Sequence, residues 1–423
     1  MNSKASIHEC FVYITLPGET SPVTAGRFVL TVDRRGTPLG RFVYGQSYLK
    51  RADAVDIDPV ELKLGRGTFE TTNLMGVFGA LRDAGPDYWG RRLIERHIRG
   101  QLGELDYLLH SPDDRAGALG FGLGVTPPAP LRKFNKTLAL AKLQTLADAV
   151  VKEEEMPGGA TEEQVRDLML LGTSMGGARP KAVVEDDEGL WLAKFSHVGD
   201  RWNNARVERA MLMLARHCGI TVPESRIETI GARDVLLVKR FDREKTSAGY
   251  RRARMVSGLT LLRAEDTYQS RDQWSYVDLV EELRRVSSVP KRDAVELFRR
   301  MCFNALITDL DDHPRNHAII AWDRDWKLSP AYDLTPANPV SLERRDLAMI
   351  CGDTGRFANA ANLQSQSARF LLGPEDAGSI IKEMADRIAA GWHVIARAER
   401  VSEADCAMIQ GAFVYPGFWS AGE

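Results

Sequence analysis

Two short polar segments in the last third of the chain carry residue types that suit phosphoryl transfer. Asp311 and Asn316 stand five positions apart, and Asp333 follows an apolar, strand-like run. In phosphoryl transfer from a magnesium nucleotide, one aspartate accepts the proton of the attacking hydroxyl, while an asparagine and a second aspartate hold Mg²⁺ against the phosphates. The spacing therefore predicts Asp311 as the catalytic base and Asn316 and Asp333 as metal ligands, with ATP and Mg²⁺ as cofactors.

A glycine-rich segment upstream could supply the phosphate-binding loop that this chemistry needs. It runs from Gly172 to Lys181 and contains Gly176 and Gly177. Glycines let backbone N–H groups approach phosphate oxygens closely. The segment matches neither of the two common glycine-loop signatures, and on its own it is more typical of a surface turn.

A lysine on the next expected strand and a glutamate in the next expected helix complete the set. Lys194 lies near the end of the strand over 190–195, and Glu208 lies inside the helix over 204–218. In kinases such a lysine contacts the phosphates, and the helix glutamate holds it in place. An edge-strand lysine and a solvated helix glutamate are the simpler explanation of each residue alone, so it is their order along the chain that favours catalysis.

The same segment contains a pair of histidines that could be read as zinc ligands. His313 and His317 stand four apart, as zinc ligands on a helix do. Pro314 breaks the helix that would align them, and no glutamate follows His313. We therefore reject a zinc site here.

A second alternative is a phosphatase of the haloacid-dehalogenase type, because Asp309-Leu-Asp311 resembles its nucleophile motif. That motif should close an apolar parallel strand, whereas residues 302–308 continue a helical pattern. An aspartate-rich turn satisfied by its own backbone is the simplest explanation of the segment in isolation. Asn316 and Asp333 stand at the spacing that a kinase site needs, and this favours a kinase over both the phosphatase and the plain aspartate-rich turn.

Composition indicates an ordinary globular protein without a bias toward nucleic acid or membranes. At 423 residues the chain can bury one large core or two to three modest ones, so several lobes are expected, and the 56 Lys and Arg nearly cancel the 58 Asp and Glu. The five cysteines are scattered without a C-x-x-C pair, which fits a reducing cytosol. We see no signal peptide and no uncharged apolar run near the roughly 18 residues that a membrane helix needs. We therefore expect a cytoplasmic protein with no membrane contact.

Hydrophobic periodicity predicts a β-rich first third and a helical last third. We expect strands over residues 11–16, 28–32, 40–44, 181–185, 190–195, 225–230 and 235–239. We expect helices over residues 87–100, 137–153, 204–218, 274–286, 291–308 and 375–400. This order predicts an α+β, two-lobed, protein-kinase-like fold with three parts. They are an extra N-terminal subdomain over 1–150, an N-lobe core over 151–240 with the glycine-rich loop and Lys194, and a mostly helical catalytic C-lobe over 241–423.

With its motifs assembled, the chain resembles HipA-type serine/threonine kinases, the toxins of bacterial type II toxin–antitoxin systems. The resemblance runs nearly end to end and rests on the segments 76–83, 85–91, 174–181, 238–243, 311–316 and 332–336. It implies catalytic roles for Asp311, Lys194 and Glu208, and metal binding by Asn316 and Asp333. The ATP-binding residues that it implies are Ser174, Gly176, Gly177, Ala178, Lys181, Lys194, Lys239, Arg240, Phe241, His313 and Asn316.

The resemblance also implies regulation through the glycine-rich loop. Ser174 aligns with a loop serine that family members autophosphorylate, which expels the loop and silences the enzyme. A dianionic phosphate there would repel the γ-phosphate and favour pairing with arginines elsewhere. Two residues depart from the common pattern: Arg315 stands where lysine is also common, and Pro180 stiffens the loop.

The partners implied by the resemblance are a protein substrate and a small antitoxin. Known family substrates include aminoacyl-tRNA synthetases, whose phosphorylation stops translation and arrests growth. The usual antitoxin is a HipB-like helix-turn-helix protein that binds operator DNA, so DNA contact is expected mainly through it. The alternative to a growth-arresting kinase is a catalytically silent scaffold or co-repressor that binds the antitoxin.

Overall fold

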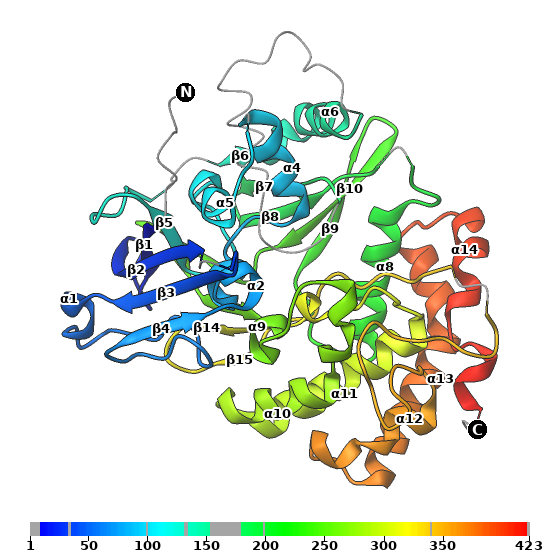
Figure 1. Ribbon diagram of the computed structural model, residues 1–423. Helices are drawn as coiled ribbons and strands as arrows, with labels where there is room; N and C mark the ends of the chain where they lie inside the picture. Colours follow the sequence, from blue (N-terminus) through cyan, green and yellow to red (C-terminus); the bar gives the residue numbers. More distant parts are fainter. Residues whose placement is uncertain are drawn as a thin grey trace. The chain divides into compact units, whose positions relative to one another are not determined.

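The computed structural model describes residues 9–32, 35–98, 100–130, 134–152, 179–197, 199–338 and 341–420 (Figure 1). The chain divides into two compact units, each built from several stretches of sequence. The first unit comprises residues 1–197, 239–265 and 320–326, and the second comprises 198–238, 266–319 and 327–423. The subdomain boundaries near residues 150 and 240 remain predictions.

The first unit begins with an antiparallel sheet whose five strands follow the order β4-β3-β2-β1-β5. The strands are β1 (Glu9–Thr15), β2 (Pro22–Val32), β3 (Pro38–Tyr44), β4 (Thr68–Thr71) and β5 (Leu119–Gly122). Burial alternates along β3, so that Phe42 and Tyr44 face the core while Arg41 and Val43 face solvent. The rings of Phe42 and Tyr44 meet edge to face at 4.9 Å, which makes this inner face the aromatic core of the sheet.

A second group of strands in the first unit ends at the predicted catalytic lysine. The strands are β6 (Asn135–Lys136), β7 (Lys181–Asp186) and β8 (Gly189–Lys194). β6 runs parallel to β7, and β7 pairs antiparallel with β8. The two-residue turn between β7 and β8 depends on Gly189, whose φ of +130° few other residues adopt. Lys194 is the last residue of β8.

The remaining elements of the first unit are short helices and a hairpin. They are α1 (Gln46–Leu49), α2 (Asn73–Gly76), α3 (Gly79–Asp83), α4 (Tyr88–His97), α5 (Glu104–His110), α6 (Leu140–Val151), α9 (Gly258–Leu262), β11 (Arg243–Thr246), β12 (Gly249–Arg252) and β13 (Arg254–Ser257). Asp87 caps α4 by accepting a hydrogen bond from the Gly90 N–H at 2.8 Å. The same carboxylate pairs with the Lys181 ammonium at 2.6 Å, and both side chains are almost completely buried. This pair fastens the first residue of β7 to the start of α4.

The second unit is mostly helical (Figure 1, green to red). Its principal helices are α8 (Asn204–His217), α10 (Tyr276–Val286), α11 (Pro290–Ile307), α12 (Ala360–Ser365), α13 (Pro374–Ala398) and α14 (Glu403–Ile409). Its strands include the antiparallel pair β9 (Ser225–Ile230) and β10 (Arg233–Lys239), and β15 (Lys327–Leu328), while β14 (Ala318–Ala321) crosses the boundary between the units. α13 packs against both α8 and α11, and α10 packs against α11.

Local signals explain where the central helices of the second unit begin and end. The Asn203 side chain caps α8 by accepting from the Arg206 N–H, and the chain leaves α8 through Gly219 at φ +79°. α11 has Pro290 in its first turn and ends where Thr308 adopts a left-handed conformation, φ +57°.

All five cysteines are buried and unpaired, and no helix of the described residues is long and apolar enough to span a membrane.

Candidate active site

The loop that follows α11 begins with a turn that buries a carboxylate. Thr308 accepts a hydrogen bond from Arg345 at 2.7 Å, which holds the left-handed turn in place. The next residue, Asp309, is completely buried and accepts the Thr335 N–H at 3.2 Å. Residues 302–307 are helical, so Asp309 does not close a strand, and the phosphatase alternative is wrong.

Asp311 and Asn316 lie together in this loop. The Asn316 amide nitrogen donates to the Asp311 carbonyl at 3.3 Å. Asn316 ends a 3₁₀ helix, Pro314–Asn316, and is buried, whereas Asp311 is exposed. The Asn316 side-chain oxygen is also buried and has no hydrogen-bond partner among the residues that the structure describes. A buried oxygen in this state costs free energy unless a ligand contacts it, and an amide oxygen is a ligand that Mg²⁺ accepts.

Asp333 is placed beside this loop by a second segment of chain. Its backbone is left-handed, with φ +60°, a conformation that aspartate tolerates better than most residues. The hydroxyl of the preceding Tyr332 donates to the Arg315 carbonyl at 2.7 Å. Together with the Asp309–Thr335 hydrogen bond, this contact joins the Asp333 segment to the loop on both sides of Asp333.

Three carboxylates thus lie close enough to influence one another. Partial loss of hydration raises the pKa of Asp311 from its ordinary value, the negative charge of Asp333 raises it further, and His313 opposes both. Burial raises the pKa of Asp309 well above its ordinary value, the Thr335 N–H opposes this, and the charges of Asp333 and Asp311 add to it. The cluster therefore holds excess negative charge that a cation would relieve.

The donor set fits magnesium better than a metal held by protein side chains alone. No group of three or more His, Cys, Asp or Glu with metal-binding geometry occurs among the described residues. Mg²⁺ usually takes one or two carboxylates and completes its shell with water and substrate phosphates. Asp333 and the free oxygen of Asn316 are the residues that would hold it.

The residues around the loop have partners of their own. His317 contacts the Asp312 carboxylate at 3.0 Å, and its ring lies against Tyr276 at 5.1 Å. The His313 ring meets Trp274 at 6.4 Å. Each histidine thus has a different aromatic neighbour, and these contacts support the loop from both ends of its 3₁₀ helix.

The predicted nucleotide-binding residues of the first unit have varied surroundings. Ser174, Gly176, Gly177 and Ala178 lie outside the described residues. Lys194 is half-buried at the end of β8. Lys181 is buried and paired with Asp87, so that a phosphate contact by its ammonium would require this pair to open. In the second unit, Glu208 is buried within α8.

The segment predicted to hold adenine contains a buried ion-pair cluster. Arg240 and Arg243 pair with Asp114 and Asp242 at 2.7–3.3 Å, and all four side chains are at most 1% exposed. Burial alone would raise the pKa of Asp242, but the charges of Arg240 and Arg243 hold it well below its ordinary range.

These contacts change what can be expected of Arg240. All three of its guanidinium nitrogens donate to protein oxygens, so its side chain is occupied by the cluster. A nucleotide contact here is left to its backbone and to neighbours such as Phe241 and Lys239, whose ammonium lies 5.6 Å from the centre of the Trp191 ring. Asp114 was not among the predicted site residues, since an aspartate 126 positions from its partner carries no distinguishing local pattern. Asp309 was considered only as part of the phosphatase motif.

Comparison with known proteins shows which fold this is. The chain aligns with HipA of the Shewanella oneidensis MR-1 toxin–antitoxin system, solved with HipB and operator DNA, at a TM-score of 0.70 and 17% identity over 95% of this chain and 94% of that one. The Helicobacter pylori proinflammatory kinase CtkA aligns at a TM-score of 0.36 and 14% identity over 54% of this chain and 94% of that one, which is too weak to support a conclusion. The first alignment confirms the predicted α+β, kinase-like fold class.

Sequence comparison gives a curated relative and a family. A Sinorhizobium fredii protein named "Putative kinase Y4mE" is 30% identical over 130 residues, which is 30% of this chain. The chain spans only 31% of the length of that relative. The model of the HipA-like C-terminal domain matches residues 173–392, more than half of the chain, and this range includes Asp311, Asn316 and Asp333. The chain therefore belongs to the HipA family.

Proposed function

We propose that this chain is a serine/threonine protein kinase that uses ATP and Mg²⁺. The observation that carries the proposal is the unsatisfied side-chain oxygen of Asn316, buried in the loop that also presents Asp311. Asp333 adds a second negative charge that acts on Asp311. A neutral oxygen ligand in the same loop as Asp311, with the charge of Asp333 acting on Asp311, suits a site completed by a magnesium nucleotide.

In the proposed reaction Asp311 orients the substrate hydroxyl and accepts its proton. Its raised pKa brings it nearer to the operating pH, which favours proton acceptance in the transition state. Asn316 and Asp333 would hold the metal, and Lys194 and Glu208 would have the roles that the family resemblance implies for them. Magnesium, when bound, neutralises the charge that develops on the phosphate oxygens.

The proposed biological role is that of a toxin in a toxin–antitoxin pair. The Shewanella protein with the same fold was solved with HipB and operator DNA. By analogy, the partner proposed here is a HipB-like helix-turn-helix antitoxin, through which operator DNA is reached. The proposed substrate is a component of translation such as an aminoacyl-tRNA synthetase, and Ser174 is the proposed autophosphorylation site.

The decisive experiment is incubation of the purified chain with γ-labelled Mg-ATP, followed by mapping of the labelled residue by mass spectrometry. Asp311→Asn should reduce label transfer by about 10²–10⁴-fold, the usual contribution of a general base, while leaving nucleotide affinity nearly unchanged. Asp376→Asn, at an exposed aspartate in the first turn of α13, is the matched control and should label like the wild type. Transfer by Asp311→Asn at the wild-type rate would refute the role of Asp311.

The alternative is a silent scaffold that binds the antitoxin and represses transcription. The presence of a complete set of catalytic residue types argues against it, since a scaffold has no need of them. It would be favoured if the wild type bound no Mg-ATP, transferred no label, and still formed a complex with the antitoxin on operator DNA.

A further inference from the structure

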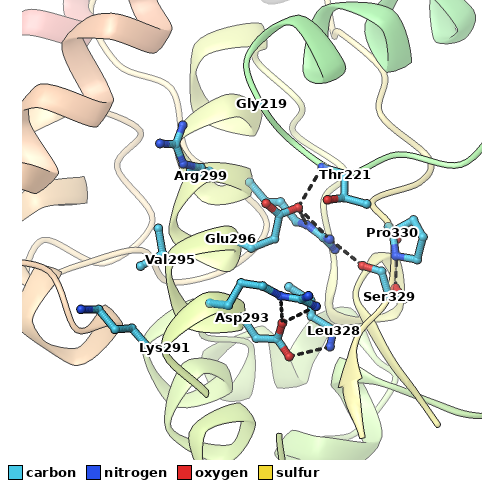
Figure 2. A pocket seen from close by; sticks show the side chains of 12 residues that line it. Gly219, Thr221, Lys291, Asp293, Val295, Glu296, Arg299, Leu328, Ser329 and Pro330 are labelled. Atoms are coloured by element: carbon cyan, nitrogen blue, oxygen red, sulfur yellow. Dashed lines mark hydrogen bonds and ion pairs between the residues drawn. The ribbon is translucent and has the colours of Figure 1, made fainter. Parts of the chain in front are cut away.

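The second unit contains a cavity of about 710 Å³ between the first half of α11 and the segment that follows β15 (Figure 2). None of Asp311, Asn316 and Asp333 lines it. Figure 2 shows Lys291, Val295 and Arg299 on successive turns of α11, and Ser329 and Pro330 across from the helix. The cavity is therefore distinct from the candidate active site.

The wall of the cavity carries an excess of positive charge. Its ionisable side chains are Lys291, Arg292, Asp293, Glu296, Arg299 and Arg300. Four cations thus stand against two carboxylates, which leaves an excess of two positive charges.

Both carboxylates already have partners inside the wall. Asp293 accepts the Leu328 N–H at 2.8 Å and the Ser287 hydroxyl at 2.7 Å. Glu296 accepts the Thr221 N–H at 3.1 Å and is paired with Arg300 at 3.0 Å. Since these acidic groups are engaged in holding the wall together, the uncompensated charge of the cavity is cationic.

Three of the cations have hydrogen-bonding capacity to spare. The side chains of Lys291 and Arg299 make no hydrogen bond or ion pair with any residue in the described part of the chain. The Arg300 side chain is only 2% exposed and donates to the Ser329 carbonyl at 2.5 Å, yet its Nη1 atom is buried without a partner among the described residues. A donor without a partner favours a ligand that brings an oxygen acceptor, and the Arg300 side chain would have to turn toward the cavity to offer its Nη1 atom.

We propose that this cavity binds a small organic phosphate. Its volume lies within the range of about 300–1,000 Å³ that is usual for small-molecule sites. Val295, Leu328 and Pro330 offer apolar contact for the body of such a ligand, and Lys291, Arg299 and Arg300 supply donors for its phosphate. The structure thus assigns a second ligand site to the unit that carries the catalytic loop.

The ligand site is connected to the active site by a short piece of chain. Ser329 and Pro330 line the cavity, and Asp333 follows three residues later. Ala331 between them donates its N–H to the Thr221 carbonyl at 2.8 Å, and Thr221 also lines the cavity. A phosphate that competes with the Ser329 carbonyl for Arg300 would act directly on the start of the segment that positions Asp333.

The test is isothermal titration of the full chain with ribose 5-phosphate, with magnesium removed, and with ribose as the uncharged comparison. The double variant Lys291→Gln/Arg299→Gln should weaken binding at least tenfold, which corresponds to about 1.4 kcal/mol. Val295→Trp, which fills the space without changing charge, should weaken it as well. Arg285→Gln removes an exposed cation from α10 in the same unit and should leave the Kd within twofold.

Each outcome decides the proposal once circular dichroism has shown that the variants fold. Retained binding in Lys194→Gln, which removes a proposed phosphate contact of the catalytic site, together with its loss in the double variant, supports a separate phosphate site. The proposal is overturned by any one of four results: no binding of ribose 5-phosphate, equal binding of ribose, wild-type binding by the double variant, or loss of binding in Lys194→Gln. The last result would place the phosphate at the proposed catalytic site, and the proposed kinase activity would stand.

Discussion

The two units each contain a cluster of aspartates, and the clusters are built on opposite principles. In the first unit, Asp114 and Asp242 are matched by two arginines, and burial of all four side chains is complete. In the second unit, the charge of Asp333 adds to the burial that raises the pKa of Asp311, and the charges of Asp333 and Asp311 add to the burial that raises the pKa of Asp309. Internal compensation marks a cluster that holds the fold together, whereas repulsion between carboxylates marks a place that a cation from outside would stabilise.

The two clusters differ in what they contribute to the free energy of folding. A buried ion pair roughly offsets the desolvation of its members, so it adds little stability, but removal of one member leaves a buried charge alone. Repulsion between neighbouring carboxylates costs stability, and binding of a cation would recover part of that cost. The comparison therefore predicts opposite responses to mutation, to ligand and to pH.

The largest effect should come from breaking the compensated cluster. Arg240→Met leaves Asp114 and Asp242 with too little positive charge, and we expect a loss of about 3–5 kcal/mol in the free energy of unfolding, measured by urea denaturation. The matched control is Arg251→Met, which removes a half-buried partner of the exposed Glu244 and should cost at most about 1 kcal/mol. Equal losses in the two variants would show that the cluster is no more important than a surface pair.

The second largest change in unfolding free energy should come from adding a magnesium nucleotide, which would supply a cation to the aspartates of the second unit. A non-hydrolysable ATP analogue with Mg²⁺, at about a hundred times its Kd, should raise the free energy of unfolding by about 2.7 kcal/mol. Asp333→Asn should lose most of this gain, because it removes a carboxylate ligand, and thermal unfolding with and without Mg²⁺ measures both. A full Mg²⁺-dependent gain in the variant would contradict the metal role of Asp333.

The third effect should be that substitutions in the two clusters change the unfolding free energy with opposite dependence on pH. The raised pKa of Asp309 means that its ionisation destabilises the fold as pH rises above the ordinary carboxyl range. Without magnesium, Asp309→Asn should therefore stabilise the protein at pH 7, and the gain should fade below about pH 4, where the wild-type carboxyl is protonated in both the folded and the unfolded state. Asp309→Asn keeps an oxygen that can accept the Thr335 N–H, so the hydrogen bond is retained.

The compensated cluster should show the reverse trend. The lowered pKa of Asp242 contributes stability above the ordinary carboxyl pKa, and this contribution declines as pH falls further. Asp242→Asn should therefore be destabilised at pH 7 and differ less from the wild type in acid. If the difference in unfolding free energy from the wild type changed with pH in the same direction for Asp309→Asn and Asp242→Asn, the proposed distinction between the clusters would be wrong.

The smallest effect should come from a contact that positions the loop without changing charge. Tyr332→Phe removes the hydrogen bond to the Arg315 carbonyl, and we expect a loss of about 0.5–1.5 kcal/mol in unfolding free energy. Since the charge of the cluster is unchanged, the pH profile should keep its wild-type shape. A changed profile would mean that Tyr332 acts on the carboxylates and not only on the backbone.

Local features of the sequence predicted much of the fold. The helix expected over 204–218 is observed over Asn204–His217, because the Asn203 cap and Gly219 are readable signals of its ends. The helix expected over 291–308 is observed over Pro290–Ile307 for the same kind of reason. The loop that brings Asp311 and Asn316 together was also predictable, since its spacing is short and Pro314 breaks the helix.

Partners far apart in sequence were not predictable. Lys181 pairs with Asp87 across 94 positions, and Arg240 pairs with Asp114 across 126. Neither carboxylate stands out locally, and hydrophobic periodicity holds no information about which charges will meet. The sequence therefore indicated nucleotide contacts for Lys181 and Arg240, whose side chains the tertiary structure engages in buried ion pairs.

The pairing of Lys181 with Asp87 also sets a mechanical limit on the glycine-rich segment. Ser174 precedes Lys181 by seven residues, and a fully extended chain advances at most about 3.3–3.6 Å per residue. As long as Lys181 stays paired with Asp87 at the start of α4, the length of the chain between residues 174 and 181 limits the positions that a phosphate on Ser174 can reach. The Cα atom of Ser174 can then lie no farther than about 25 Å from that of Lys181, so the guanidinium of any arginine that captures the phosphate must lie within this distance plus the length of the phosphoserine side chain.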